Sequence, residues 1–181
     1  TGSSIMMNIG NSTLPPPEGL VTSIGWGRNK TIDYVFEGNI HCTGDTINWL
    51  VNDLQLIESA DVSEELAKSV DGTEGVYLFP AFVGLGAPYW DQYARGTLVG
   101  LTRGTTDSHI ARAILEGIAF QVYDIVKAME TDSGVKTTEL RVDGGAAASD
   151  LLLQIQSDLF GFNILRPQCL ETTALGAACL A

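Results

Sequence analysis

Three short segments place small residues and hydroxyl groups where a strand or a turn passes into another element, a combination suited to binding phosphate groups. The clearest is Val142-Asp143-Gly144-Gly145, where a strand-like run ends in two glycines and a helical pattern resumes at Ser149. Successive glycines let the backbone approach a ligand closely, and the start of a helix presents free N–H groups and the positive end of its dipole. This segment predicts a nucleotide-binding turn, and a tight strand-to-helix turn without a ligand explains the pattern equally well.

The other two segments carry the same chemistry more weakly. Thr1-Gly2-Ser3-Ser4 supplies hydroxyls and a glycine at the start of a strand, which could hydrogen-bond phosphate oxygens. Gly44 opens a helical pattern and Asn48 follows one turn later, an arrangement that could frame a nucleobase. Alone, each pattern is more typical of a turn or a helix cap.

Other kinds of active site are not indicated by the sequence. There is no P-loop lysine signature and no Gly-x-Ser-x-Gly motif, and His41 and His109 lie far apart without partners at metal-ligand spacing. His109, near an expected helix start, is interpreted as a surface or packing residue. The aromatic loop Pro88-Tyr89-Trp90-Asp91 is interpreted as packing, since large aromatic side chains mostly bury area. Six acidic residues are interpreted as a solvated face and loop, with no catalytic pair among them. They are Asp45, Asp53, Glu58, Asp61, Glu64 and Glu65.

The composition is that of a folded domain with an acidic surface. A length of 181 residues, of which 45% are hydrophobic and 18% charged, predicts one domain with a sizeable core. The formal net charge of −12 argues against nucleic acid or an anionic membrane as a partner, because both attract basic surfaces. A small phosphorylated ligand stays compatible, since backbone N–H groups and a divalent cation can hold phosphates. The three widely spaced cysteines fit neither a disulfide framework nor a metal site, which predicts reduced thiols in a cytoplasmic protein.

Hydrophobic periodicity predicts the elements that position these segments. Strands are expected at residues 3–8, 21–26, 33–36, 76–79, 140–143 and 163–166, with a shaped loop at 84–91. Helices are expected at 44–57, at 107–130, from Ser149 or Asp150 onward, and again from residue 172. Asp107 or Ser108 is the expected N-cap of the long helix. Strands first, then helices alternating with single strands, predict an α/β layered domain.

Longer motifs add a resemblance to a known family. The run Gly96-Thr-Leu-Val-Gly-Leu101, followed by His109-Ile110 and Ala113-Ile114-Leu115-Glu116, is similar in residue type and spacing to a signature of the FGGY family of carbohydrate kinases. The loop Gly84-Leu-Gly-Ala-Pro-Tyr-Trp-Asp91 resembles the members of that family that phosphorylate glycerol. The resemblance covers all 181 residues. It implies a ribonuclease H-like or actin-like ATPase domain of the sugar kinase–heat-shock protein–actin superfamily, with a mixed sheet flanked by helices.

The resemblance also assigns roles to the candidate residues. Ser4 stands where glycerol-specific members place a phenylalanine against the polyol, whereas Asn48 and Ser149 replace their usual glutamine and asparagine. The residues that match the family's nucleotide contacts lie in the three segments described above: Thr1, Gly2, Gly44, Asn48, Gly144, Gly145 and Ser149.

For the chain as a whole, the resemblance implies that residues 1–181 are the C-terminal nucleotide-binding domain of a longer enzyme, whose N-terminal substrate domain carries the catalytic aspartate. That enzyme would use ATP and Mg²⁺ to phosphorylate a terminal hydroxyl of glycerol, and no metal ligand is expected in this chain. The chain alone is expected to be inactive and to bind ATP weakly, and the full-length enzyme to be a cytoplasmic homo-oligomer. Two alternatives are a kinase for another polyol or a ketopentose, and a non-catalytic actin-like nucleotide-binding module.

Overall fold

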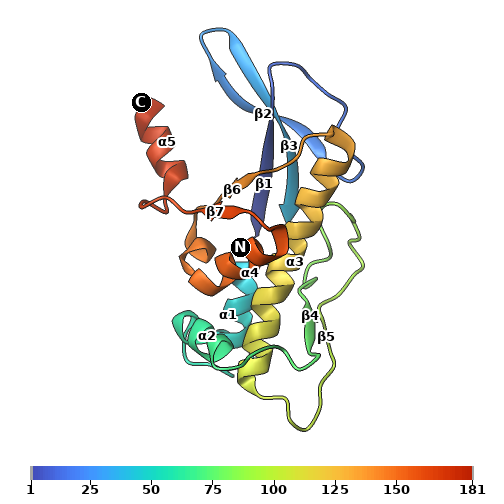
Figure 1. The fold of residues 1–181 in the computed structure, drawn as a ribbon, viewed down its shortest axis with the longest axis vertical. Helices are drawn as coiled ribbons and strands as arrows, with labels where there is room; N and C mark the ends of the chain where they lie inside the picture. The colour runs from blue at the N-terminus through green and yellow to red at the C-terminus, as the bar shows by residue number, and fades with distance from the viewer. Residues whose placement is uncertain (1, 181) are drawn as a thin grey trace.

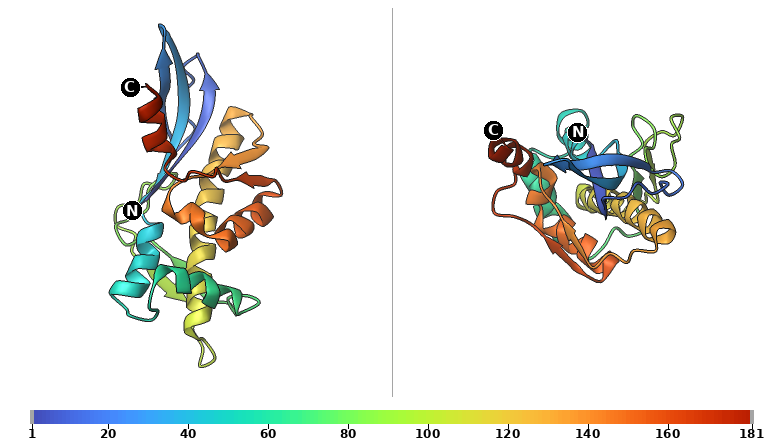
Figure 2. Two further views of the ribbon diagram at one scale, coloured as in Figure 1. Left: turned by 90° about the vertical axis from the view of Figure 1, so that its left-hand side faces the viewer. Right: turned by 90° about the horizontal axis from the view of Figure 1, so that it is seen from above.

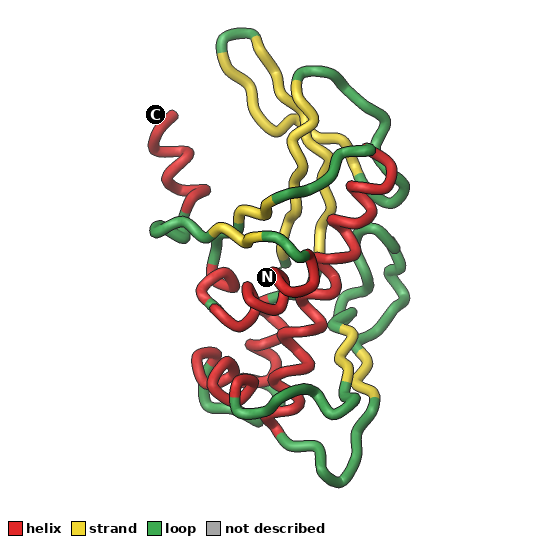
Figure 3. Tube along the Cα trace, in the orientation of Figure 1, coloured by secondary structure: helices red, strands yellow, loops and turns green. Residues whose placement is uncertain are grey.

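The computed structural model describes residues 2–180, and one long helix, α3, runs through the molecule (Figure 1). Small sheets and most of the shorter helices pack around it, whereas the C-terminal helix stands apart and buries no residue (Figure 3). In chain order the elements are β1 (Ser3–Gly10), β2 (Val21–Arg28), β3 (Thr31–Ile40), α1 (Gly44–Asn52), α2 (Ala60–Lys68), β4 (Tyr77–Phe79), β5 (Thr97–Val99), α3 (Asp107–Ser133), β6 (Glu139–Arg141), the 3₁₀ helix η1 (Gly145–Ala148), α4 (Asp150–Phe160), β7 (Asn163–Leu165) and α5 (Thr172–Leu180).

The main sheet is antiparallel, with β3 in the middle between β1 and β2. Alternate residues of β3, among them Phe36, Gly38 and Ile40, are buried on the face that packs against α3. A Cβ atom on Gly38 would lie 2.6 Å from the Cγ2 atom of Ile125 on α3, so sheet and helix come this close only because no side chain separates them. The pair β4–β5 is antiparallel and the pair β6–β7 is parallel, so both kinds of strand pairing occur, in separate sheets.

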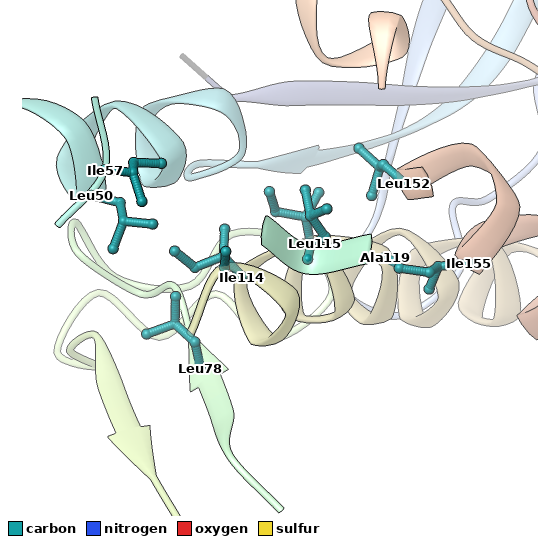
Figure 4. Packing of buried hydrophobic residues seen from close by; sticks show 11 residues of the cluster. Leu50, Ile57, Leu78, Ile114, Leu115, Ala119, Leu152 and Ile155 are labelled. Atoms are coloured by element: carbon teal, nitrogen blue, oxygen red, sulfur yellow. The ribbon is translucent and has the colours of Figure 1, made fainter. Parts of the chain in front are cut away.

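The spine of the core is the apolar stripe of α3, which lies on the buried side of the helix as its periodicity predicts. Full burial of one such aliphatic side chain stabilises the fold by roughly 1.5–3 kcal/mol. The stripe joins two clusters, one with α1, α2, α4 and β4 and one with the main sheet. Figure 4 shows Leu50, Leu78 and Leu152 approaching α3 from three different elements. The buried residues of the stripe are Ile114, Ile118, Val122, Ile125 and Met129.

The N-cap of α3 is Thr106, which precedes the predicted Asp107 or Ser108 by one or two residues. Thr106 has the extended backbone of a cap, and its N–H donates to Nδ1 of His109 at 3.1 Å. His109 therefore helps to cap the helix rather than serving only as a surface or packing residue. The predicted N-cap is displaced because His109 occupies the third helical position, where a capping box usually has the carboxylate or amide of Glu or Gln.

Two other expectations about the helices are wrong. The helix expected over residues 44–57 ends at Asn52, and Gln55 has φ 53°, outside the helical region. The acidic stretch that follows is a helix, α2, and not a loop. Its buried face is formed by the small residues Ser63 and Ala67, whose size gives almost no hydrophobic signal in the sequence.

The aromatic loop between β4 and β5 is held by the polar ends of its aromatic side chains. The Trp90 indole N–H donates to the Gly19 carbonyl at 2.6 Å, and the Tyr89 hydroxyl donates to the Asp124 carboxylate at 2.8 Å. Both rings are about half exposed, at 56% for Tyr89 and 51% for Trp90. The interpretation as packing is therefore corrected: the anchoring comes from hydrogen bonds more than from buried area.

Candidate nucleotide site

The start of β1 and the start of α1, two of the three predicted segments, lie side by side. The Ser3 hydroxyl donates to the Thr43 hydroxyl at 3.0 Å, and α1 begins at the next residue, Gly44. The Thr43 N–H donates to the Asp45 carboxylate at 2.8 Å, which fixes the first turn of α1. Figure 2, left, shows the start of β1 beside α1 and close to the segment that precedes α4. Thr1 itself lies outside the described residues.

A groove lies between the start of β1 and the turn that follows β6, so segments from opposite ends of the chain face each other. One wall carries Ser3 and Ser4, and the other carries Asp143, Ala146 and Ala147. Side chains from α3 and α4 also line the groove. Because Asp143 and Ala146 flank the two glycines of the turn, a ligand bound on the turn would reach the start of β1.

The groove also contains a buried polar group, the side-chain amide of Gln156 on α4. Gln156 is 4% exposed, and its Oε1 atom has no hydrogen-bond partner. A buried acceptor without a partner costs about 1–3 kcal/mol, so a donor that entered the groove would be stabilised there. Sequence reasoning missed Gln156, because a glutamine on an amphipathic helix gives no signal of its position relative to another strand.

The glycine turn after β6 has a defined backbone. Gly144 has φ 80°, a conformation that favours glycine, and its N–H donates to the Leu170 carbonyl at 2.9 Å. The 3₁₀ helix η1 follows, and Ser149 is then the N-cap of α4, accepting a hydrogen bond from the Leu152 N–H at 3.2 Å. The helix start at Ser149 and Asp150 is confirmed. Ser149 has a capping role in the fold, and its proposed contact with a nucleotide stays a prediction.

The predicted site glycines fall into two groups according to whether the fold itself needs them. A Cβ atom on Gly2 would lie 2.1 Å from the Ile40 carbonyl oxygen, so packing alone requires glycine there. A Cβ atom on Gly44 or Gly145 would meet nothing within 4 Å, and neither residue has a left-handed backbone. Neither sterics nor backbone conformation therefore requires glycine at these two positions, and their contact with a nucleotide stays a prediction.

Ser4, the residue predicted to lie near the substrate, is exposed on the outer face of the main sheet. Its hydroxyl donates to the Glu37 carboxylate at 3.1 Å, and Ser23 and Asn39 donate to the same carboxylate at 2.8 and 3.3 Å. The hydrogen bond from Ser23, followed by those from Asn39 and Ser4, holds the pKa of Glu37 below its usual value, although burial acts in the opposite direction. Because the Ser4 hydroxyl donates its hydrogen bond to Glu37, its oxygen is left to accept hydrogen bonds.

Asn48 lies on α1 one turn after Gly44, with an exposed side chain. The structure thus brings the start of β1 against the start of α1 and, across the groove, against the glycine turn. The assignment of each residue to a phosphate, a base or a polyol stays a prediction.

Glu64 was interpreted as part of a solvated face, and this interpretation is wrong. From α2 it reaches the start of α4, where its carboxylate accepts a hydrogen bond from the Leu151 N–H at 3.1 Å, and it forms an ion pair with Lys68. Burial raises the pKa of Glu64, but hydrogen bonds from Lys68, Ser149 and Leu151 outweigh it, so the net shift of the pKa is downward.

Arg166, one residue after β7, is the second residue that sequence reasoning missed. Its Nη1 atom donates to the carbonyls of Ala147 and Ala148 at 3.0 and 3.1 Å, and its Nη2 atom lies 2.8 Å from the Asp150 carboxylate. The only available signal was that β6 and β7 both end at this edge, where loops of α/β domains gather ligands.

Within residues 2–180, no group of three or more His, Cys, Asp or Glu side chains is placed to hold a metal ion. Over the same residues, no helix is long and apolar enough to span a membrane.

The sequence and the fold match one family over the whole chain. The C-terminal domain of the FGGY family of carbohydrate kinases matches residues 1–181, and the chain therefore belongs to that family. Among solved structures, the chain has a TM-score of 0.90 to glycerol kinase from Plasmodium falciparum with ADP, at 36% identity over 99% of this chain. It has a TM-score of 0.83 to ligand-bound xylulose kinase from Lactobacillus acidophilus, at 26% identity over 100% of this chain. The predicted α/β, actin-like fold is confirmed by these neighbours.

Several relatives that are more than half identical to the chain are glycerol kinases. The chain is 54% identical to glycerol kinase from Dichelobacter nodosus and 56% identical to that from Rhodopirellula baltica, in each case over 100% of this chain. It covers 36% and 34% of the length of these two proteins, and 36% of each of the two solved chains. The chain thus spans about a third of the proteins that it matches.

Proposed function

We propose that this chain is the ATP-binding domain of a glycerol kinase, which transfers the γ-phosphoryl group of ATP to a terminal hydroxyl of glycerol. Curated glycerol kinases more than 50% identical to the chain support the substrate, and the ADP named with the Plasmodium falciparum enzyme supports the nucleotide. Such a transfer depends mainly on positioning and on stabilising charge. The catalytic aspartate and most of the polyol-binding side chains would come from the part of the enzyme outside this chain.

The observation that carries the proposal is the pair of glycines that the fold does not need. Gly44 opens α1 and Gly145 opens η1, and both leave open space where a Cβ atom would otherwise stand. Glycine loses more backbone entropy on folding than other residues, and at these two positions no close packing contact requires it. Close approach of a nucleotide to the backbone explains both positions.

ATP fits this site through backbone groups and hydroxyls rather than through a basic patch. With a net charge of −12, the chain would repel a polyanion unless a divalent cation accompanied it. We expect Mg²⁺ to be bound mainly by the phosphates of ATP, where it neutralises their charge. The start of β1, with Gly2 and Ser3, would then face the phosphates across the groove from the turn at Gly145.

Ser4 favours a second candidate substrate, a larger polyol or a ketopentose. Its hydroxyl donates to Glu37, so its oxygen can accept a hydrogen bond from an additional substrate hydroxyl. A small polyol such as glycerol has no hydroxyl beyond its three carbons to use this acceptor. The same domain would serve either kinase, because the nucleotide groove does not change.

We further propose that the full-length enzyme is a cytoplasmic homo-oligomer. Cys42, Cys169 and Cys179 are free thiols, as expected in a reducing compartment. An apolar groove lined by Phe79 and Phe120 lies on the side of β4 and α3, and both side chains are exposed. An exposed apolar surface of this kind would suit contact with a second copy of the chain.

The test is phosphoryl transfer by the full-length enzyme, followed by coupled release of ADP, with glycerol, erythritol, xylulose and ribulose as acceptors. Preference for glycerol would support the proposal, and preference for a longer acceptor would support the reading of Ser4. ATP-dependent filaments without any phosphorylated product would instead indicate a non-catalytic actin-like module. The isolated domain should release no ADP with any acceptor, because the catalytic aspartate lies outside it.

A further inference from the structure

The glycine turn after β6 is held at its carbonyl side by Arg166. One guanidinium nitrogen donates to two successive carbonyls, those of Ala147 and Ala148, and the other lies beside Asp150. Asp150 is 70% exposed at its side chain, so solvent screens the ion pair and the two carbonyl bonds carry most of the interaction. These carbonyls belong to the last residues of η1, which have no helical partner further along the chain.

Glu64 holds the same turn at its amide side. Its carboxylate accepts from the Leu151 N–H, in the first turn of α4, and interacts with the hydroxyl of Ser149. A negative group at this position also complements the positive end of the α4 dipole. Arg166 and Glu64 therefore meet residues 147–151 from two different elements, with a cation against carbonyl groups and an anion against an N–H group.

A turn with two successive glycines needs such external support. Glycine loses more conformational freedom on folding than any other residue. Ala147 is buried and Ala146 packs against the core, but Gly145 and Ala148 on either side of them are exposed. The planar guanidinium carries several N–H groups in fixed directions and can hydrogen-bond two neighbouring carbonyls at once. A lysine ammonium acts as a single point charge and lacks this fixed arrangement. The shape that the turn presents to the groove thus depends on two charged side chains that do not line the groove.

We propose that Arg166 and Glu64 are positioning residues that clamp the turn between β6 and α4 in the shape that binds the nucleotide. This inference rests on the proposed function, since it takes the turn at Gly145 as a nucleotide contact. Neither residue needs to touch ATP, because each acts through the backbone of residues 147–151.

The experiment compares Arg166→Ala, Arg166→Lys and Glu64→Gln in the full-length enzyme, with separate KM values for ATP and for the acceptor. Arg166→Ala should raise the KM for ATP by about tenfold, the effect of losing one or two hydrogen bonds from a charged donor. Arg166→Lys should raise it by about threefold, because one carbonyl bond can be restored. Glu64→Gln should raise it by about threefold, and the KM for the acceptor should stay within twofold in all three.

Two control variants make the same chemical changes away from the turn. Arg95→Ala removes an Arg95 guanidinium that also donates to two backbone carbonyls, those of Gln92 and Ala94, in the aromatic loop. Glu65→Gln makes the same charge change as Glu64→Gln on the neighbouring, exposed residue of α2. Both controls should leave the KM for ATP within twofold.

The outcomes separate this inference from the proposed function. If the full-length enzyme phosphorylates an acceptor but the Arg166 and Glu64 variants keep the KM for ATP, or raise both KM values equally, the clamp is overturned and the function stands. If no acceptor is phosphorylated by the unmodified enzyme, the proposed function itself fails. If Arg166→Ala does not fold, the KM values of Arg166→Lys and Glu64→Gln decide whether the clamp stands, since both variants keep hydrogen-bonding groups at the turn.

Discussion

The start of β1 and the turn after β6 face the same groove, yet glycine serves opposite purposes in the two regions. At the start of β1, the hydrogen on Gly2 is the only substituent that fits beneath the Ile40 carbonyl. At the turn, Gly145 has free space around it and an ordinary backbone conformation. The first glycine is required by packing within the fold, whereas packing and backbone conformation do not require the second, which is a predicted nucleotide contact.

The comparison shows how a candidate site can be divided into its structural and its binding parts. Gly2, with Ser3 bonded to Thr43, joins β1 to α1 and so builds one wall of the groove. Gly44 and Gly145 have open space around them, and we predict that they contact the nucleotide. Substitutions should therefore separate into those that damage the fold and those that damage only nucleotide binding.

Gly2→Ala should have the largest effect, because it breaks the wall itself. The new Cβ atom would lie 2.1 Å from the Ile40 carbonyl oxygen, so β1 must shift away from β3. We expect the free energy of unfolding of the full-length enzyme to fall by about 3 kcal/mol, with loss of activity. Denaturant unfolding measures the change, and Gly44→Ala, which meets no atom, should show no such loss. Equal stability of the two variants would contradict the division.

Gly145→Ala should have the next largest effect, and on binding alone. A methyl group there meets nothing within 4 Å in the protein, so the free energy of unfolding should stay constant or rise by up to about 1 kcal/mol. The same methyl group would occupy the space left for the nucleotide, and we expect the KM for ATP to rise about tenfold.

The matched control for Gly145→Ala is Gly72→Ala. Gly72 also has open space around it and no left-handed backbone, but it follows α2 and is not part of the turn between β6 and α4. Its substitution should leave the KM for ATP unchanged. If Gly145→Ala also left that KM unchanged, the turn would be a connection between β6 and α4 without a ligand.

Ser4→Ala should have a smaller effect, on the choice of acceptor. The change removes the oxygen that Glu37 orients, and with it the predicted hydrogen bond to a longer polyol. Loss of one hydrogen bond costs about 1 kcal/mol, so kcat/KM for the longer polyol should fall about fivefold relative to glycerol. Ser23→Ala is the control, because Ser23 bonds the same carboxylate from β2. An unchanged ratio of erythritol to glycerol turnover in Ser4→Ala would show that Ser4 does not contact the acceptor.

The sequence predicted best where one large side chain or one backbone rule decides the structure. The stripe of α3 was predicted because Ile114, Ile118 and Val122 repeat with the helical period. The turn at Gly144 was predicted because two successive glycines indicate a backbone conformation that residues with a side chain disfavour. The helix α2 was missed because Ser63 and Ala67, which it buries, are too small to give a hydrophobic pattern.

The supports of the site could not be predicted, because they depend on how separate elements pack. Nothing near Glu64 in the sequence indicates that α2 will reach the start of α4. Arg166 lies 18 and 19 positions from the carbonyls that it binds, and the contact exists only because β7 pairs in parallel with β6. Side chains that touch a ligand leave a local pattern, whereas side chains that hold those residues in place do not.

The smallest predicted effect concerns Glu64, whose contribution to stability should depend on pH. Its pKa in the folded protein lies below the ordinary value of 4.5, so the folded state favours the carboxylate. The stabilisation is therefore complete above the unfolded pKa and is lost as the pH falls through the lower, folded pKa. Glu64→Gln should lower the free energy of unfolding by about 1 kcal/mol at pH 7, and the difference from the unmodified protein should vanish in strongly acidic solution.

Unfolding curves of the two proteins between neutral and acidic pH would measure that convergence. For Glu65→Gln, on the exposed side of α2, the free energy of unfolding should change with pH as it does in the unmodified protein. If Glu64→Gln also followed the unmodified protein, the carboxylate would not support the start of α4. The turn would then depend on Arg166 alone, and the two sides of the groove would differ further, since the wall at β1 is held by backbone contact and the turn by a single charge.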